Sequence, residues 1–151
     1  MDDSSRTHRE LIEENILLKE KIRALELSEA LCKKTLGALR TSEEKFSVSF
    51  LKSPIPLAIT AMKDGRYIDV NEAFAEVMGL AREDLLQKTS LSAGFISSEE
   101  RTAFLREYQE NGFVRNLELP IRVKNGEKRY GLFNSSRIAI QGEEFFLTMV
   151  T

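Results

Sequence analysis

The strongest structural signals of the chain lie in residues 64–74, which read DGRYIDVNEAF. Asp64-Gly65 is typical of a two-residue hairpin turn, because glycine readily adopts the positive φ that such turns need. The next residues, 66–70, alternate between the two faces as a half-buried strand does. Asn71 offers a side-chain oxygen that can cap a helix, and Phe74 belongs to the apolar face of that helix. These residues therefore predict a turn, a strand and a helix in direct succession.

A further strand precedes this stretch. Residues 53–56, Ser-Pro-Ile-Pro, end any helix that comes before them, because proline lacks the backbone N–H that a helix interior requires. The apolar run 57–62 then has the length of a core strand. Joined by the Asp64-Gly65 turn, the strands 57–62 and 66–70 are expected to pair antiparallel.

Two more helices are predicted after the first, which ends at Gly79. A short helix covers 82–87. Ser97 and Glu100 have the spacing of a capping box and open a longer helix, which ends at Asn111-Gly112.

The last third of the chain has the pattern of strands. Three strands, at 113–124, 129–140 and 145–150, are separated by turns at 125–126 and 141–142. Alternation assigns one face of the first strand to Phe113, Leu117, Leu119, Ile121 and Val123, and the other to Val114, Asn116, Glu118, Pro120, Arg122 and Lys124. The element order predicts an α+β fold with a five-stranded antiparallel sheet.

Residues 9–41 have a different pattern, that of a long coiled-coil helix. Apolar side chains recur every seven residues, at Leu11, Leu18, Leu25, Cys32, Leu39 and Phe46. A second, half-apolar line contains Asn15, Ile22, Glu29 and Leu36. Together the two lines form a seam that a second helix can cover. Across this seam, Glu14 would face Lys19 of a second copy, and Lys21 would face its Glu26, and both attractive pairs favour a parallel homodimer. The predicted dimer interface is Leu11, Asn15, Leu18, Ile22, Leu25, Cys32, Leu36 and Leu39.

An alternative for this helix is that it packs on its own domain, which the apolar residues off the seam favour: Ile16, Leu17, Leu27 and Leu31. Gly37, and the capping-box spacing of Thr41 and Glu44, predict that the helix breaks near residue 40. The expected organisation is a flexible leader at 1–8, a dimerisation helix at 9–41 and a folded domain at 42–151.

Composition excludes several classes of protein. The 151 residues are 42% hydrophobic and 30% charged, so a packed core is expected rather than disorder. The net charge of −2 gives no excess for binding nucleic acid. With one cysteine and one histidine, a zinc site is not expected, and no apolar run reaches the length of a membrane span. A cytoplasmic protein without a signal peptide is expected.

The order of elements and several motifs resemble the PAS domain, a small sensory fold. The resemblance covers residues 42–151. It rests on Ser42-Glu43-Glu44-Lys45-Phe46, the run to Ser53-Pro54, the stretch from Asp64-Gly65 to Phe74, Gly79, and the hairpin of Lys124-Asn125-Gly126-Glu127. It implies helices packed on one face of the sheet around a small cavity, which senses a ligand or relays a signal.

Departures from the family's patterns bear on cofactors. Two photochemical branches of the family, the flavin branch and the photoactive-yellow-protein branch, bond their pigment through a cysteine. Residues 71–112 contain none. The haem branch uses a histidine on or near the helix at 98–111, which also has none. Cysteinyl flavin and haem are therefore not expected, no cofactor is identifiable, and a noncovalent flavin or a small organic acid stays open. A catalytic set is not expected either, because His8, in the leader, is the only histidine.

Candidate pocket residues combine apolar walls with polar groups expected to face the helices: Phe74, Met78, Phe104, Phe133, Asn134, Ser135, Ser136 and Thr148. The alternative for each is an ordinary core or backbone-satisfying role. The functional hypothesis is a sensory and dimerising module that signals through its coiled coil to an effector after Thr151, a histidine kinase or a diguanylate cyclase. Its rivals are a small-molecule-binding module, an enzyme and a plain scaffold.

Overall fold

The computed structural model describes residues 2–151, and their side chains from Thr7 onward. The chain divides into two units, Met1–Phe46, here called the stem, and Ser47–Thr151, here called the globular unit. A single helix, α1 (Asp2–Leu51), supplies the whole described stem and ends inside the globular unit. No helix among the described residues is long and apolar enough to cross a membrane.

Helix α1 has no break near residue 40, so that prediction is wrong. The Thr41 hydroxyl does not cap a new helix but donates to the Gly37 carbonyl, 3.0 Å away and one turn earlier. A single glycine costs a helix only about 1 kcal/mol, and the residues around Gly37 are good helix formers. The helix therefore continues to Leu51, two residues before Ser53-Pro54. The flexible leader predicted at 1–8 begins with Met1, which lies outside the described residues, and α1 starts at Asp2.

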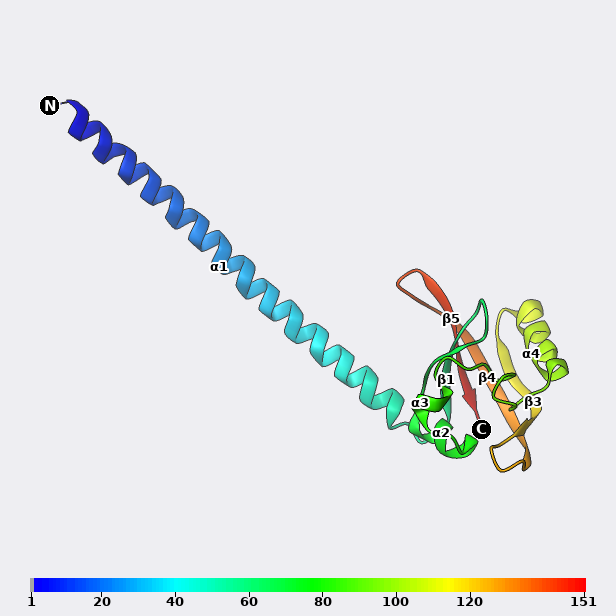
Figure 1. Ribbon diagram of the computed structural model, residues 1–151. Coiled ribbons are helices and arrows are strands. Elements are labelled where there is room, and N and C mark those ends of the chain that lie inside the picture. The colour runs from blue at the N-terminus through cyan, green and yellow to red at the C-terminus, as the bar shows by residue number, and fades with distance from the viewer. Residues whose placement is uncertain (1) are drawn as a thin grey trace. The chain divides into compact units, whose positions relative to one another are not determined.

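The globular unit is built on a five-stranded antiparallel sheet (Figure 1). Its strands are β1 (Leu57–Ala61), β2 (Tyr67–Val70), β3 (Val114–Arg122), β4 (Lys128–Ile140) and β5 (Glu143–Val150), in the spatial order β2-β1-β5-β4-β3. The first and last strands in sequence pair directly, with Leu57 opposite Met149 and Ala61 opposite Phe145. This pairing confirms the predicted antiparallel sheet and joins the beginning of the globular unit to its end.

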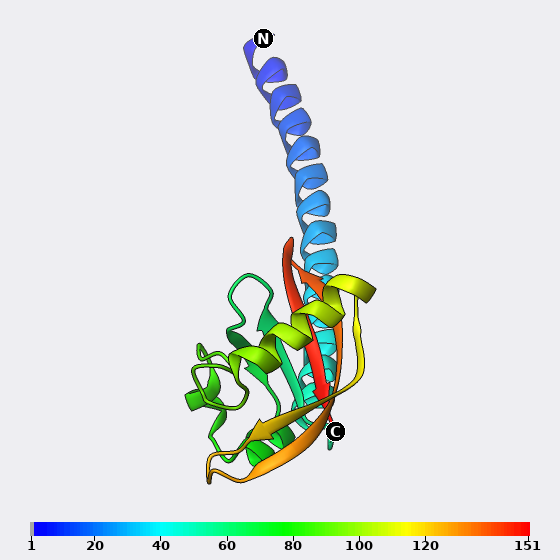
Figure 2. The ribbon, with the colours of Figure 1, turned by 90° about the vertical axis from the view of Figure 1, so that its right-hand side faces the viewer.

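Three helices cover one face of this sheet, α2 (Glu72–Met78), α3 (Arg82–Leu85) and α4 (Ser98–Asn111) (Figure 2). The caps predicted at Asn71 and Ser97 are confirmed. The Asn71 side chain accepts from the Phe74 N–H at the start of α2, and a full capping box of Ser97 and Glu100 opens α4. Helix α3 is shorter than the predicted 82–87, because the chain turns at Gln87 (φ 70°), whose N–H donates to the carbonyl of Tyr67.

Alternation along the strands divides the core between the two faces of the sheet. On β1, Ala58 packs with the side chains of α2, whereas Ile59 and Ala61 join a cluster on the opposite face. That second cluster is completed by Phe50, from the last turn of α1, and Phe145 of β5.

The predicted faces of β3 are correct only in its second half. Leu119 and Ile121 are buried as expected, but Val114 is buried and Phe113 is 40% exposed, the reverse of the prediction. The pairing of β3 with β4 shifts between Val114 and Leu117, and Asn116 adopts a φ of 49°. Such a bulge inserts an extra residue, and every side chain before it changes face.

Candidate ligand-binding site

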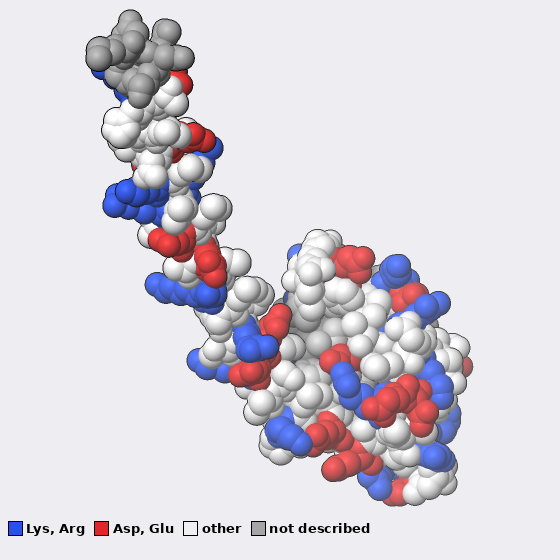
Figure 3. Space-filling model, turned by 60° about the vertical axis from the view of Figure 1, so that its left-hand side comes forward, with Lys and Arg blue, Asp and Glu red and all other residues white. Residues whose placement is uncertain are grey.

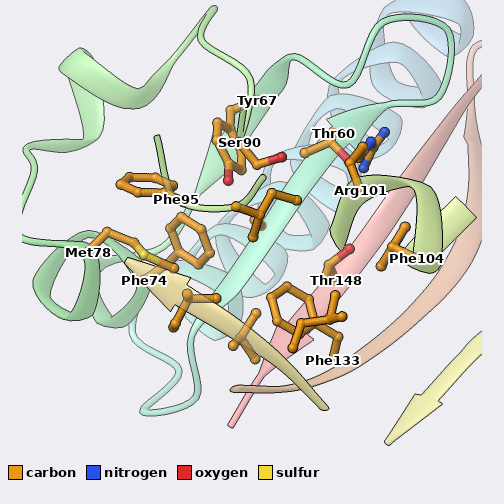
Figure 4. Close-up of a pocket in the computed structure, with 15 residues that line it drawn as sticks. Thr60, Tyr67, Phe74, Met78, Ser90, Phe95, Arg101, Phe104, Phe133 and Thr148 are labelled. Atoms are coloured by element: carbon orange, nitrogen blue, oxygen red, sulfur yellow. The ribbon is translucent and has the colours of Figure 1, made fainter. Parts of the chain in front are cut away.

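A cavity lies between the sheet and its helices (Figure 4). Five strands, α2, α4 and the segment between α3 and α4 contribute to its wall. The centre of a water molecule has about 40 Å³ to move in, which is room for about three or four waters. The cavity is therefore small, and only a compact ligand fits it without movement of the wall.

Helical and strand periodicity direct the side chains into this space. Phe74 and Met78 are one turn apart on α2, and Arg101 and Phe104 are three residues apart on α4, so each pair shares a face. On β5, Thr148 and Val150 point to the helices because they alternate with residues of the other face.

Aromatic rings make up much of the wall. The Tyr67 ring lies 5.5 Å from that of Phe74 and 6.5 Å from that of Phe95, centroid to centroid. At the other side, the Phe104 and Phe133 rings meet edge to face at 6.3 Å. Ring pairs at such distances and angles are favourable contacts, so they help to fix the shape of the wall.

Polar groups on the wall are few, and most are hydroxyls. Thr60, Tyr67 and Ser90 make no side-chain hydrogen bond to any other described residue. The Thr148 hydroxyl is 2.9 Å from that of Ser135, which also donates to the Leu147 carbonyl. Burial raises the pKa of Tyr67 strongly, with a smaller opposing effect from Arg101, so its phenol stays protonated and can donate.

Arg101 is the only charged side chain on the described wall. Its guanidinium carbon lies 5.4 Å above the centre of the Phe104 ring. The Asp64-Gly65 turn comes close on another side, since a Cβ added at Gly65 would lie 3.1 Å from Arg101 Nη2. Among the described residues, no carboxylate pairs with this guanidinium. Burial lowers the pKa of Arg101, with Tyr67 acting in the opposite direction.

The predicted pocket residues are only partly brought together. Five of the eight line the cavity: Phe74, Met78, Phe104, Phe133 and Thr148. Three do not, Asn134, Ser135 and Ser136: Ser135 is buried behind Thr148, Ser136 is exposed, and Asn134 accepts the Asn116 N–H at the β3 bulge at 3.0 Å. Any contact between these eight residues and a ligand stays a prediction.

Sequence reasoning missed the polar part of the wall, above all Thr60, Tyr67, Ser90 and Arg101. A usable signal existed for Arg101. It precedes the predicted wall residue Phe104 by three positions on a helix whose start was correctly located, and residues at that spacing share a face.

The stem carries the other predicted site. Its apolar seam is exposed in this single chain, for example 49% for Leu18, 52% for Ile22 and 69% for Leu25. Figure 3 shows Lys and Arg alternating with Asp and Glu among uncharged surface along the stem. The dimer interface itself stays a prediction. Among the residues that the structure describes, no cluster of three His, Cys, Asp or Glu side chains is arranged to hold a metal ion.

Comparison with known proteins agrees with this architecture. The family model described as "PAS domain" matches residues 54–151, well over half of the chain. None of the curated proteins matches the chain significantly.

Solved structures with the same fold come from several kinds of protein. A PAS domain of an HTR-like protein from Haloarcula marismortui is 18% identical, with a TM-score of 0.60, over 79% of this chain and 98% of that chain. A PAS domain from a two-component sensor histidine kinase is 15% identical, with a TM-score of 0.61, over 73% of this chain and 97% of that one. The LOV protein of Rhodobacter sphaeroides is 16% identical, with a TM-score of 0.58, over 74% and 66%. At these identities the structures establish the shared fold alone. Taken with the family match, the sheet order and the cavity between sheet and helices, they show that the chain belongs to the PAS domain family.

Proposed function

We propose that this chain is a sensory module of a larger cytoplasmic signalling protein, and that its stem forms a parallel coiled-coil homodimer that carries the signal to an effector. The effector would be a histidine kinase or a diguanylate cyclase that follows Thr151. The module itself would sense rather than catalyse. One observation carries the proposal, namely the exposed heptad seam of the stem.

The stem needs a partner on energetic grounds. Its apolar seam repeats over about 35 residues, roughly 50 Å of helix, and a lone helix in water gains nothing from that seam. Burying one leucine side chain contributes about 1.5–3 kcal/mol, so several seam leucines together outweigh the cost of association. A second copy of the chain offers the matching seam.

Two polar residues on the seam fit a relay. Asn15 and Glu29 both belong to the half-apolar line of the seam. A buried asparagine there favours one register of the two helices, and a carboxylate weakens their packing. Within one chain, Glu29 pairs with Lys33 at 2.9 Å on the helix surface. A marginal coil with two packings of similar free energy is the kind of element that a sensor domain can bias.

The test is the oligomeric state of the intact chain. Light scattering should give a dimer for the wild type and a monomer for the double variant Leu18→Asp/Leu25→Asp, which places charges on the seam. Its control, Leu17→Asp/Leu27→Asp, replaces two leucines that lie off the seam and should stay dimeric. A monomeric wild type, or equal dissociation of both variants, would contradict the proposal. In the complete protein, Asn15→Leu/Glu29→Leu should change the signalling output.

A second candidate function is a ligand-binding module in which the cavity matters more than the dimer. The cavity with its unpaired Arg101 supports it. Flavin is a poor fit as the occupant. No cysteine in 71–112 could form a covalent bond to a flavin, and the centre of a water molecule has only about 40 Å³ to move in, so a three-ring isoalloxazine does not fit unless the wall moves. Purified protein with absorbance beyond the protein range would indicate a larger ligand than the cavity shows.

A further inference from the structure

We propose that the cavity of the globular unit binds a small organic anion, a short carboxylate with a compact apolar body, and that Arg101 binds its charged end. The proposal deepens the sensory role proposed above by naming the class of ligand. It rests on the geometry of the cavity wall, and it concerns the globular unit alone.

The first argument is the charge that Arg101 leaves uncompensated. A guanidinium has five N–H donors in one plane and no acceptor, and that of Arg101 donates to no described residue. The Phe104 ring offers a cation–π contact but no hydrogen-bond acceptor. A half-buried cation in this state is stabilised by an anion that reaches it from the cavity.

The second argument is that the neighbouring acidic residues are already engaged. Asp64, in the turn beside Arg101, pairs with Arg66 at 3.3 Å and accepts its backbone N–H at 3.1 Å. Glu100, next to Arg101 on α4, accepts the Ser97 N–H in the capping box. The carboxylate for Arg101 therefore has to come from outside the wall.

The third argument is the arrangement of hydroxyls. In Figure 4 the hydroxyls of Thr60 and Thr148 point to the side of the cavity where the Arg101 guanidinium lies. Thr60, Tyr67 and Ser90 have free donors, and hydroxyls and a guanidinium are the groups that hold a carboxylate in proteins. Arg101 fits the planar carboxylate best, because its fork binds both oxygens at once.

The rest of the wall determines the polarity of the ligand's other end. Phe74, Met78 and Phe95 lie away from Arg101 and offer no hydrogen-bonding groups, so an apolar body is preferred there. Since the centre of a water molecule has only about 40 Å³ to move in, the whole ligand is limited to a short-chain acid such as propionate, lactate or pyruvate.

The test is a titration of the intact, ¹⁵N-labelled chain with sodium acetate, propionate, lactate and pyruvate at constant ionic strength. At least one acid should cause saturable amide shifts at Tyr67, Ser90 and Arg101. Propionamide, which has the shape of propionate without its charge, should bind about tenfold or more weakly than propionate, because charge-assisted hydrogen bonds are lost. No saturable shift with any of the four acids, or equal binding of amide and acid, would overturn the proposal.

Variants locate the charge partner. Arg101→Gln should weaken binding by about tenfold or more, whereas Arg106→Gln, on the exposed side of the same helix, should bind as the wild type does. Arg101→Lys keeps the charge but loses the fork, and an intermediate affinity is expected. Wild-type affinity in a folded Arg101→Gln would overturn the proposal. If that variant does not fold, the comparison of acid with amide on the wild type decides.

The outcome is separable from that of the dimer. A chain that binds a carboxylate at Arg101 but scatters light as a monomer would contradict the coiled-coil relay and leave the carboxylate site intact. A dimer that binds none of the four acids would contradict the carboxylate site and leave the coiled-coil relay intact.

Discussion

The stem and the globular unit place their apolar side chains in opposite environments. In the globular unit, Phe146, Leu85 and Val70 are at most 1% exposed, and side chains from six or more elements meet around them. In the stem, leucines of the same apolar character, such as Leu25 and Leu27, are about 70% exposed. Both units are well formed by local criteria, since each has good helix or strand formers in regular patterns.

The difference shows where the stability of each unit comes from. The globular unit buries its apolar side chains within one chain, because its strands pair with one another from its beginning, at β1, to its end, at β5. The stem is one helix, and a single helix buries almost nothing of its own surface. Its stability therefore depends on a partner, whereas that of the globular unit depends on its own core.

The largest effect is expected from removing the centre of the core. Phe146→Ala should lower the unfolding free energy of the globular unit by about 4 kcal/mol, since Phe146 is 1% exposed and meets Phe104 and Tyr108 edge to face. Urea denaturation followed by near-ultraviolet circular dichroism measures it. All three tyrosines lie in the globular unit, so the tyrosine signal reports that unit alone. The matched control Phe113→Ala, at a residue 40% exposed, should cost less than about 1 kcal/mol.

A smaller effect is expected from Asn71, which ties three segments together. Its Oδ1 accepts the N–H groups of Phe74 and Leu57, each at 2.9 Å, and its Nδ2 donates to the Ile55 carbonyl at 2.8 Å. Asn71→Ala should cost about 2–3 kcal/mol in the same denaturation experiment, because a helix cap is lost and buried groups stay unpaired. Asn125→Ala, which removes one hydrogen bond in an exposed hairpin, should cost about 0.5 kcal/mol. Equal losses in the two variants would contradict the role of Asn71.

The smallest effect depends on pH. The hydrogen bond from the Ser97 backbone N–H lowers the pKa of Glu100 in the folded chain. Its stabilising effect is therefore complete above the pKa of an unfolded glutamate, about 4.3, and is lost as the pH falls through the lower folded value. Glu100→Gln should cost about 0.5 kcal/mol at neutral pH, and the gap to the wild type should close below about pH 4.

Denaturation midpoints at a series of pH values measure this gap. Glu99→Gln, in the same turn of α4 but outside the capping box, is the control and should show a weaker pH dependence. A gap that does not change with pH would show that the charge of Glu100 has no part in the cap.

Prediction from the sequence succeeded where the signal was local. The caps at Asn71 and Ser97 and the glycines at 79 and 112 located two helices to within a residue, because each signal concerns backbone groups a few positions away. It failed at Gly37 and Thr41, where a weak local signal competes with a long run of helix formers, and at the β3 bulge, where Asn134 of the neighbouring strand accepts the Asn116 N–H.

The candidate site was half predicted for the same reason. Phe74, Met78 and Phe104 were accessible to sequence reasoning because helical periodicity marks an inward face. Thr60, Tyr67 and Ser90 come from three separate segments, and nothing local distinguishes them from other polar residues, whereas Arg101 could have been found from its spacing to Phe104.

The amino-acid sequence by itself determined the order and type of the elements, the family resemblance and the heptad seam, since turns, caps and periodicity act over a few residues. Only the tertiary structure decided that β1 pairs with β5 and that Arg101 lines a cavity without pairing with a carboxylate of a described residue. The physical reason is that strand pairing and charge compensation are set by contacts between segments far apart in the chain, and the free energy of such contacts exists only once the segments have met.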